Sequence, residues 1–253
     1  MRPIINKHLL SLPSALLLLA FTFSVQCVEI KVVTEYLEPY QIKKADGSLG
    51  GFSTEVVEAL FKRTNHTANI IVMPWARAYE VAKKEPNVMI FSIARTPSRN
   101  ELFQWIGKLT EERLYFWGLK TNFVEPIDDI DKLKDYKIGA SRFSNAAQYL
   151  IDNKFYNIYQ LIKEDQNMQM LYKKRVDLIV ATEMTLQTRS KKLGLNFEKM
   201  RIIKEVNELN NDLSLAFNLN SDAKLVHQFQ QAFQTIKEQG ILEKLRQKWQ
   251  IED

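Results

Sequence analysis

The chain has 253 residues, of which 45% are hydrophobic, 35 are basic and 30 are acidic. The net charge of +5 is spread along the chain without a basic block, which indicates solubility and argues against nucleic-acid binding, because that needs Lys and Arg clustered on one face. We find no low-complexity tract or Gly/Ser-rich linker, so the composition is that of a folded globular protein.

The first 27 residues predict a secretory signal peptide. Arg2 and Lys7 precede an uncharged apolar run from Leu9 to Phe23, and polar residues follow before Cys27. A membrane span is the competing interpretation, but this run of 15 residues contains Pro13 and falls short of the ~20 that a spanning helix needs. We therefore expect cleavage near Cys27 and export to the periplasm, which leaves a mature chain of about 226 residues.

Cys27 is the only cysteine, so we expect no disulfide in the mature protein. Stability must then come from core burial, for which the mature length suffices as one large domain or two lobes of about 100 residues. We do not expect a lipid anchor at Cys27, because lipoprotein signals have a small residue before the cysteine and here it is Gln26.

Residues 29–99 alternate between strand and helix patterns. Short β-rich runs at 29–34 and 69–73 and a continuous apolar run at 88–93 predict strands. A helix is expected after Phe52, and Pro74-Trp75 opens a second one. Turn signals at 46–51 suggest a small hairpin before the first helix. The β-α-β-α-β order predicts parallel strands with right-handed crossovers.

The pattern repeats in residues 136–181, so two similar half-sheets and two lobes are expected. In each lobe, strand order 2-1-3 would place a crevice between the loops after the first and third strands. These loops are polar or aromatic and comprise residues 35–40 and 94–99 in the first lobe, and 141–145 and 182–185 in the second.

The tail predicts a strand at 212–217 and amphipathic helices at 222–238 and 241–249, which lack a core of their own. We expect the tail to return to the first lobe. The predicted lobes are 28–114 with 212–253, and 115–211. The chain would cross between them near 114–121 and 205–212, and two such crossings form a hinge.

The apolar strand at 88–93 runs directly into a polar turn. Thr96-Pro97 forces an extended turn, and Arg95 and Arg99 offer guanidinium groups that can bind a carboxylate with two parallel hydrogen bonds. The turn lies at the carboxyl end of a predicted parallel strand, which is where open α/β sheets bind ligands.

A set of short motifs extends over the whole mature chain in a characteristic order. The chain thereby resembles the periplasmic solute-binding proteins that deliver amino acids to ABC transporters, known as the family 3 extracellular solute-binding proteins. The motifs are Pro39-Tyr40 with Asp46-Gly47 and Gly51-Phe52, Pro74-Trp75, Thr96-Pro97-Ser98-Arg99, Lys137-Ile138-Gly139, Arg175-Val176-Asp177, Gly240-Ile241-Leu242 and Lys248-Trp249.

The resemblance implies a two-lobed, type II periplasmic-binding-protein fold that closes on a small solute. It implies an amino acid or similar carboxylate as ligand, polar or cationic in its side chain, an ABC permease of the inner membrane as partner, and a monomer. It implies no cofactor.

In this family the arginine of a Thr-x-x-Arg motif clamps the ligand carboxylate, which carries over to Thr96 and Arg99. The alternative is that Arg99 neutralises a surface acid such as Glu101. Trp75 matches the aromatic residue that covers the ligand, although a plain core tryptophan is the alternative.

Other first-lobe positions follow from the resemblance less directly. Tyr36 and Tyr40 compete for a second aromatic wall, because the family's counterpart falls near Leu37. Glu35 lies where relatives contact polar groups of the ligand. Two further candidates, Ser92 and Ala94, stand where relatives place a glycine and a threonine that touch it.

In the second lobe, Ser144 and Asn145 begin a predicted helix where the family offers hydroxyl and backbone donors, although Ser144 can also be read as a helix cap. Many relatives have an aspartate after the strand at 176–181 that holds the α-ammonium group. This chain has Thr182, with Glu183 beside it as the possible substitute.

The main alternative function is a periplasmic enzyme on the same fold, such as a dehydratase acting on a small organic acid. Catalysis needs a proton-transfer group near the reacting bond. The three histidines, His8, His66 and His227, fall outside the predicted crevice loops, and we find no cluster typical of a metal site and no phosphate loop. A third possibility, the sensor half of a membrane receptor, would need a second span or a signalling domain. We therefore expect a binding protein that is not an enzyme and has no metal.

Overall fold

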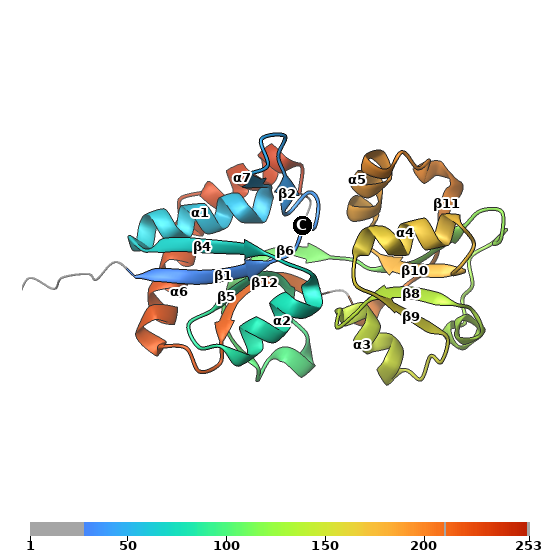
Figure 1. The fold of residues 1–253 in the computed structure, drawn as a ribbon, viewed down its shortest axis with the longest axis horizontal. Helices are drawn as coiled ribbons and strands as arrows, with labels where there is room; N and C mark the ends of the chain where they lie inside the picture. The colour runs from blue at the N-terminus through green and yellow to red at the C-terminus, as the bar shows by residue number, and fades with distance from the viewer. Residues whose placement is uncertain (1–27, 210, 252–253) are drawn as a thin grey trace, which may run out of the picture.

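The computed structural model describes residues 28–209 and 211–251. The predicted signal peptide and Cys27 lie outside the described residues. Two separate bodies, each built on a five-stranded sheet, lie side by side and are joined by two chain segments (Figure 1). We call them lobe 1 and lobe 2. None of the helices within the described residues is long and apolar enough to span a bilayer.

The sheet of lobe 1 has strand order β4-β1-β5-β12-β6. Its first three strands, in the expected order 2-1-3, pair in parallel, whereas β12 runs antiparallel to both β5 and β6. A hairpin of β2 and β3 precedes the first helix, as its turn residues indicated. The strands are β1 (Glu29–Thr34), β2 (Ile42–Lys43), β3 (Leu49–Gly50), β4 (Thr67–Val72), β5 (Met89–Ala94), β6 (Phe103–Glu112) and β12 (Asn211–Asn218).

Helices cover both faces of this sheet. On one face, α1 (Phe52–Thr64), α6 (Ala223–Glu238) and α7 (Ile241–Trp249) bury a core that includes Phe52, Phe217 and Phe229. On the other face, α2 (Trp75–Lys84) packs over β5. The C-terminal helices therefore lie in the same lobe as the N-terminal strand, which explains why the tail needs no core of its own (Figure 1).

The sheet of lobe 2 has strand order β11-β7-β10-β8-β9 and again contains the order 2-1-3. α3 (Asn145–Asp152) covers one face, whereas α4 (Glu164–Tyr172) and α5 (Glu183–Leu193) cover the other. The strands are β7 (Tyr115–Leu119), β8 (Ile138–Ser141), β9 (Ile158–Leu161), β10 (Leu178–Ala181) and β11 (Met200–Glu205). Four short 3-10 turns complete the fold, at Pro97–Arg99, Ile130–Asp135, Phe197–Lys199 and Asn207–Leu209.

The chain passes from lobe 1 to lobe 2 between Glu112 and Tyr115, and back between Glu205 and Asn211. The backbone amide of Val206 donates to the carbonyl of Leu114 at 2.9 Å, so the two segments lie side by side. The first crossing is shorter than the expected 114–121, because Tyr115–Leu119 already pairs with β10 and β11 as part of the second sheet.

Candidate functional site

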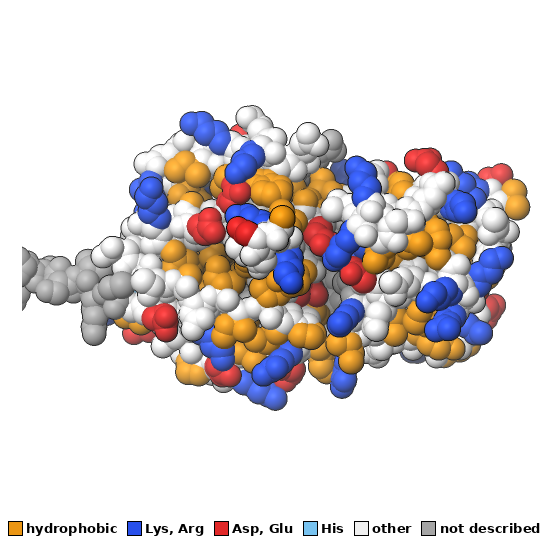
Figure 2. Space-filling view, turned by 45° about the horizontal axis from the view of Figure 1, so that its top comes forward, with side chains coloured by type: hydrophobic (Ala, Val, Ile, Leu, Met, Phe, Trp, Pro, Cys, Tyr) orange, Lys and Arg blue, Asp and Glu red, His pale blue; other side chains and the backbone are white. Residues whose placement is uncertain are grey.

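A cavity lies where the two lobes meet. Together with the open solvent at its mouth, it contains about 640 Å³ of space between the protein atoms. Figure 2 shows acidic and basic side chains gathered around the recess between the lobes. From lobe 1 the cavity is lined by Glu35, Leu37, Trp75, Ser92, Ala94, Arg99, Glu112 and Leu213, and from lobe 2 by Ser141, Ser144, Asn145, Ala146, Val180, Ala181, Thr182, Thr185 and Arg189, with Leu114 at the crossing.

Arg99 is the buried cation of the lobe 1 wall. Its side chain is 5% exposed, and its guanidinium lies 4.9 Å from the ring centre of Tyr79 and 5.6 Å from that of Trp75. Burial lowers the pKa of Arg99, an effect that Tyr79 partly offsets, although an arginine stays charged at any physiological pH. Among the described residues, no carboxylate forms an ion pair with Arg99. A buried guanidinium in this setting suits an anionic guest.

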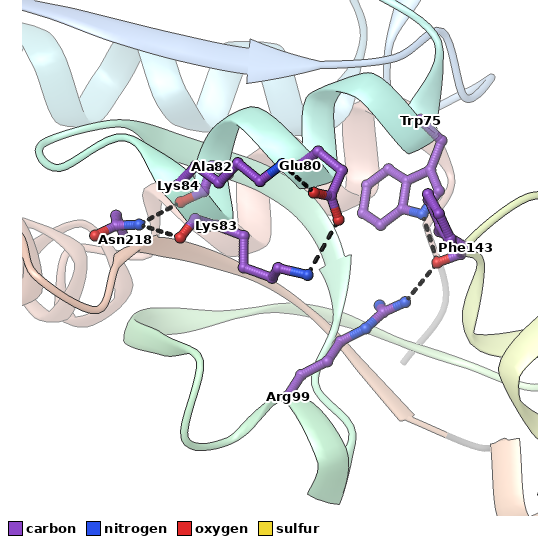
Figure 3. Close-up of polar contacts among 8 residues, drawn as sticks. All are labelled: Trp75, Glu80, Ala82, Lys83, Lys84, Arg99, Phe143 and Asn218. Carbon is purple, nitrogen blue, oxygen red and sulfur yellow. Dashed lines mark hydrogen bonds and ion pairs between the residues drawn. The ribbon is translucent and has the colours of Figure 1, made fainter.

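Arg99 and Trp75 reach across to lobe 2 and share one acceptor (Figure 3). The indole Nε1 of Trp75 donates to the carbonyl oxygen of Phe143 at 3.0 Å, and Nη2 of Arg99 donates to the same oxygen at 3.1 Å. Nη1 of Arg99 donates to the carbonyl of Ala94 at 3.2 Å. Trp75, the first residue of α2, is 6% exposed and packs in a hydrophobic core cluster, as the core interpretation expects, and it also lines the cavity.

Two helices of lobe 2 begin at the cavity. Ser144 caps α3 by accepting from the amide of Ala147 at 3.0 Å, and Thr182 caps α5 by accepting from the amide of Thr185 at 3.2 Å. Ser144 is therefore a helix N-cap, as the alternative interpretation expects, and it also lies on the cavity wall. The free amides of a helix start and the positive end of its dipole favour a negative group nearby.

A chain of charged groups runs from the lobe 2 wall to lobe 1. The Nε of buried Arg189 lies 3.0 Å from Oδ1 of Asp165, whose second oxygen lies 3.2 Å from Nζ of Lys192. Lys192 in turn pairs with Glu38 of lobe 1 at 3.0 Å. Burial works against the charged form of Lys192, but its contacts with Glu38 and Asp165 outweigh this effect and raise its pKa. The Lys192–Glu38 ion pair links the two lobes.

The structure brings together eight of the residues expected at the site, namely Arg99, Trp75, Ala94, Ser92, Glu35, Ser144, Asn145 and Thr182. Thr96 lies instead in a neighbouring recess of about 790 Å³, which shares Arg99 and Asn145 with the cavity.

Tyr36, Tyr40 and Glu183 lie away from the cavity. Tyr36 is 38% exposed. Tyr40 is buried in the lobe 1 core against Phe52, because the chain turns inward there, and Leu37 occupies the wall instead. The carboxylate of Glu183, in the first turn of α5, is exposed and accepts from Gln187 at 2.9 Å.

Glu112 and Arg189 were not expected at the site, and Ser141 and Thr185 fall within the predicted crevice loops 141–145 and 182–185 but were not among the individual candidates. Thr185 and Arg189 follow Thr182 at helical spacing, so a helix beginning at Thr182 puts all three on one face. That signal was available in the sequence. Glu112 ends a strand that the sequence pattern did not reveal, and only the pairing of β6 with β12 places it at the cavity.

Within the described residues, no group of three or more His, Cys, Asp or Glu side chains could hold a metal ion. His66 lies behind the lobe 1 core, where its ring stacks on Phe229 and accepts from the amide of Val28. His227 lies on α6 in the same lobe, and neither histidine lines the cavity.

Sequence comparisons agree with the resemblance that the motifs indicated. Residues 30–116 match the model of bacterial extracellular solute-binding proteins, family 3. An arginine-binding periplasmic protein of Mannheimia haemolytica is 24% identical over 92% of this chain and 95% of its own length. These two matches confirm the similarity to family 3 amino-acid solute-binding proteins.

Solved structures share the fold. A histidine kinase sensor domain described as similar to periplasmic binding proteins superimposes with a TM-score of 0.78 at 14% identity, covering 88% of this chain and 96% of that one. An ancestral arginine-binding protein with bound arginine gives a TM-score of 0.75 at 18% identity, over 87% and 97% of the two chains. The two-lobed periplasmic-binding-protein fold is therefore confirmed.

Proposed function

We propose that this protein, as a relative of the family 3 solute-binding proteins, is a periplasmic receptor that closes on a small amino acid and presents it to an ABC permease. It acts as a monomer through the two lobes of one chain, and it binds its solute without transforming it. The relatives found by sequence are described as binding proteins, so the dehydratase alternative is not favoured.

One observation carries the proposal: the buried guanidinium of Arg99 at the cavity between the lobes. A planar guanidinium binds a carboxylate through two parallel hydrogen bonds, and a site closed to water strengthens the pair. Tyr79 and Trp75 hold the group in place by their ring faces. The α-carboxylate of an amino acid is the natural partner of this arrangement.

The cavity also favours a cationic side chain. Glu35 and Glu112 both line it from lobe 1, where Glu112 also accepts from the hydroxyl of Tyr40, and carboxylates in a partly buried site attract guanidinium or ammonium groups. Lobe 2 has no carboxylate at Thr182 for the ligand's α-ammonium group, and Glu183 is turned away. The acids of lobe 1 would then serve both positive groups of a ligand such as arginine, which the similar Mannheimia protein is named for binding.

The test is thermal unfolding and calorimetry of the mature chain with L-arginine, L-lysine, L-histidine, L-glutamine and small organic acids including prephenate. A ligand at 100 times its Kd adds about 2.7 kcal/mol to the free energy of unfolding. For a chain of this length that raises the Tm by about 5–10 °C. We expect L-arginine or L-lysine to give the largest shift.

Arg99→Ala should abolish that shift, and Arg99→Lys should weaken binding at least tenfold because lysine keeps the charge but loses the planar fork. The matched control is Arg95→Ala in the same turn, since Arg95 contacts Asn100 and Trp105 outside the cavity and its loss should leave binding intact. Absence of any amino-acid ligand, or turnover of prephenate, would refute the proposal.

A further inference from the structure

Two serines on opposite walls of the cavity each have a buried amide side chain behind them. In lobe 1, Nε2 of Gln41 donates to Oγ of Ser92. In lobe 2, Nδ2 of Asn167 donates to Oγ of Ser141 at 3.4 Å. All four side chains are at most 6% exposed, and both serines line the cavity. The same device thus occurs once in each lobe.

The direction of these hydrogen bonds decides what the serines can offer. A serine hydroxyl has one proton and two lone pairs. When an amide N–H occupies a lone pair, the proton remains available for another acceptor. No acceptor for the hydroxyl proton of Ser92 or Ser141 is found among residues 28–209 and 211–251, so each proton is left for a guest in the cavity.

A contribution to folding stability does not explain why Gln41 and Asn167 have amide side chains. The oxygens Oε1 of Gln41 and Oδ1 of Asn167 are buried and have no hydrogen-bond partner among the described residues. A buried polar atom without a partner costs folding free energy, so a leucine at either position would serve the core as well or better. Neutral amides do what a leucine cannot, because they donate to a hydroxyl and fix its orientation.

The direction of the hydrogen bond to each serine also requires an amide rather than a carboxylate. A carboxylate at position 41 or 167 would accept the serine proton and leave a lone pair facing the cavity, which reverses what the site offers. The backbone supports a fixed position for Ser92, whose φ of 57° lies in the left-handed region, unusual for a residue within a strand.

We propose that Gln41 and Asn167 are positioning residues that orient the Ser92 and Ser141 hydroxyls so that they donate hydrogen bonds to the solute. The two serines would therefore favour ligands that have acceptor oxygens in the part that lies between the two lobes. This inference rests on the proposed function, because it assumes that the cavity takes a carboxylate-bearing solute. It assigns the carboxylate end of that solute to donors from both lobes, with Arg99 as the charged one.

The first test compares L-arginine with L-argininamide, in which an NH2 group replaces one carboxylate oxygen. Gln41→Leu and Asn167→Leu should each weaken L-arginine binding about tenfold and reduce the preference for the acid over the amide. In a Ser92→Ala background, Gln41→Leu should cost nothing more, because a positioning residue acts only through its serine. An equal loss in both backgrounds, or an unchanged preference, would overturn the inference.

A matched control separates positioning from folding. Asn218 is a fully buried amide that donates to the carbonyls of Ala82 and Lys83, outside the cavity (Figure 3). Asn218→Leu should lower the Tm but leave the ratio of the two affinities unchanged.

Neutron diffraction on deuterium-exchanged crystals of the mature chain tests the inference without any ligand. The inference is supported if an Nε2–D group of Gln41 points to Oγ of Ser92 while the hydroxyl deuteron of Ser92 points into the cavity. It is overturned if the hydroxyl deuteron of Ser92 points to Oε1 of Gln41. If wild-type protein fails to bind L-arginine, that failure refutes arginine as the ligand, and the neutron result still decides the roles of Gln41 and Asn167.

Discussion

The carbonyl oxygen of Phe143 is one point where residues of the two lobes meet. It accepts from both Trp75 and Arg99, and Phe143 has a φ of 61°, which turns this carbonyl out of a regular backbone path. Part of the donor capacity of Arg99 is thus used by the carbonyl oxygens of Ala94 and Phe143. Under the proposed function, the same side chain would act both on the solute and on closure of the lobes.

Trp75→Phe keeps an aromatic ring, removes the Nε1 donor and makes the side chain smaller, a loss of size that Trp105→Phe shares. We expect the ligand affinity to fall about three- to tenfold, since one hydrogen bond contributes about 1 kcal/mol to a closed state that includes it. Calorimetry with L-arginine measures this loss. Trp105→Phe is the control, because Trp105 lies outside the cavity, and an equal effect of both changes would argue against a role for the Phe143 contact.

Tyr149 gives a pH-dependent prediction. Burial, and then the charge and hydrogen bond of Glu208, raise the pKa of its phenol from 10.0 to about 12. The folded state favours the neutral phenol, so this stabilisation is present below about pH 10 and is lost as the pH rises toward 12. Urea unfolding should show a smaller decline over this interval for Tyr149→Phe than for wild type. If the free energy of unfolding declines equally with pH in wild type and Tyr149→Phe, the raised pKa of Tyr149 does not contribute to the decline.

At the scale of elements, α3 contributes through its first turn. The helix has eight residues and begins at the cavity with Ser144 as its cap. A cap stabilises the helix by satisfying an amide, and the same turn offers other amides to an anion. Stability and binding can be separated here by choosing the capping side chain.

Ser144→Ala removes the cap and should lower the free energy of unfolding by about 1 kcal/mol. Ser144→Asp keeps a good cap and should retain stability, but it adds a negative charge where the ligand carboxylate is expected, so binding should fall more than for Ser144→Ala. Urea unfolding and calorimetry on both variants measure the two effects. Stronger binding by the aspartate variant would show that a cation lies at this helix.

At the scale of the whole molecule, the lobes meet through polar contacts and through Met184 of α5, an apolar side chain that packs against the hydrophobic core of lobe 1. The Glu38–Lys192 ion pair joins the two bodies, and within the part of the chain that the structure describes the backbone connects them through residues 113–114 and 206–209. A narrow double connection is the usual architecture of a hinge. The ion pair would then favour the closed arrangement.

Lys192→Met should shift the ligand-free protein toward more open conformations, measured as a larger radius of gyration by X-ray scattering. Because a surface ion pair contributes at most about 1 kcal/mol, we expect the ligand affinity to fall about two- to fivefold, and less at high salt. Lys191→Met is the matched control, since no ion pair of Lys191 is found among the described residues. Identical scattering curves for wild type, Lys192→Met and Lys191→Met would show that the Glu38–Lys192 ion pair does not favour the closed arrangement.

The sequence by itself determined most of the helices and the β-α-β-α-β order of each lobe, but not the strands β6, β7 and β11. The apolar run at 88–93 is buried along its whole length, and the repeated β-α-β-α-β pattern leads to strand order 2-1-3 in both sheets. These features follow from local periodicity and from the handedness of crossovers, both of which can be read along the chain. The polar loops after the first and third strands therefore meet at one cavity.

The tertiary structure decided which side chains face that cavity and which groups lie behind them. Tyr40 and Glu183 resemble site residues in the sequence, yet one packs in the core and the other on an exposed helix turn. Glu112, Gln41 and Asn167 gain their places through contacts with distant residues. Such contacts join residues tens of positions apart, and local pattern carries no information about them, because packing and hydrogen-bond satisfaction are properties of the folded whole.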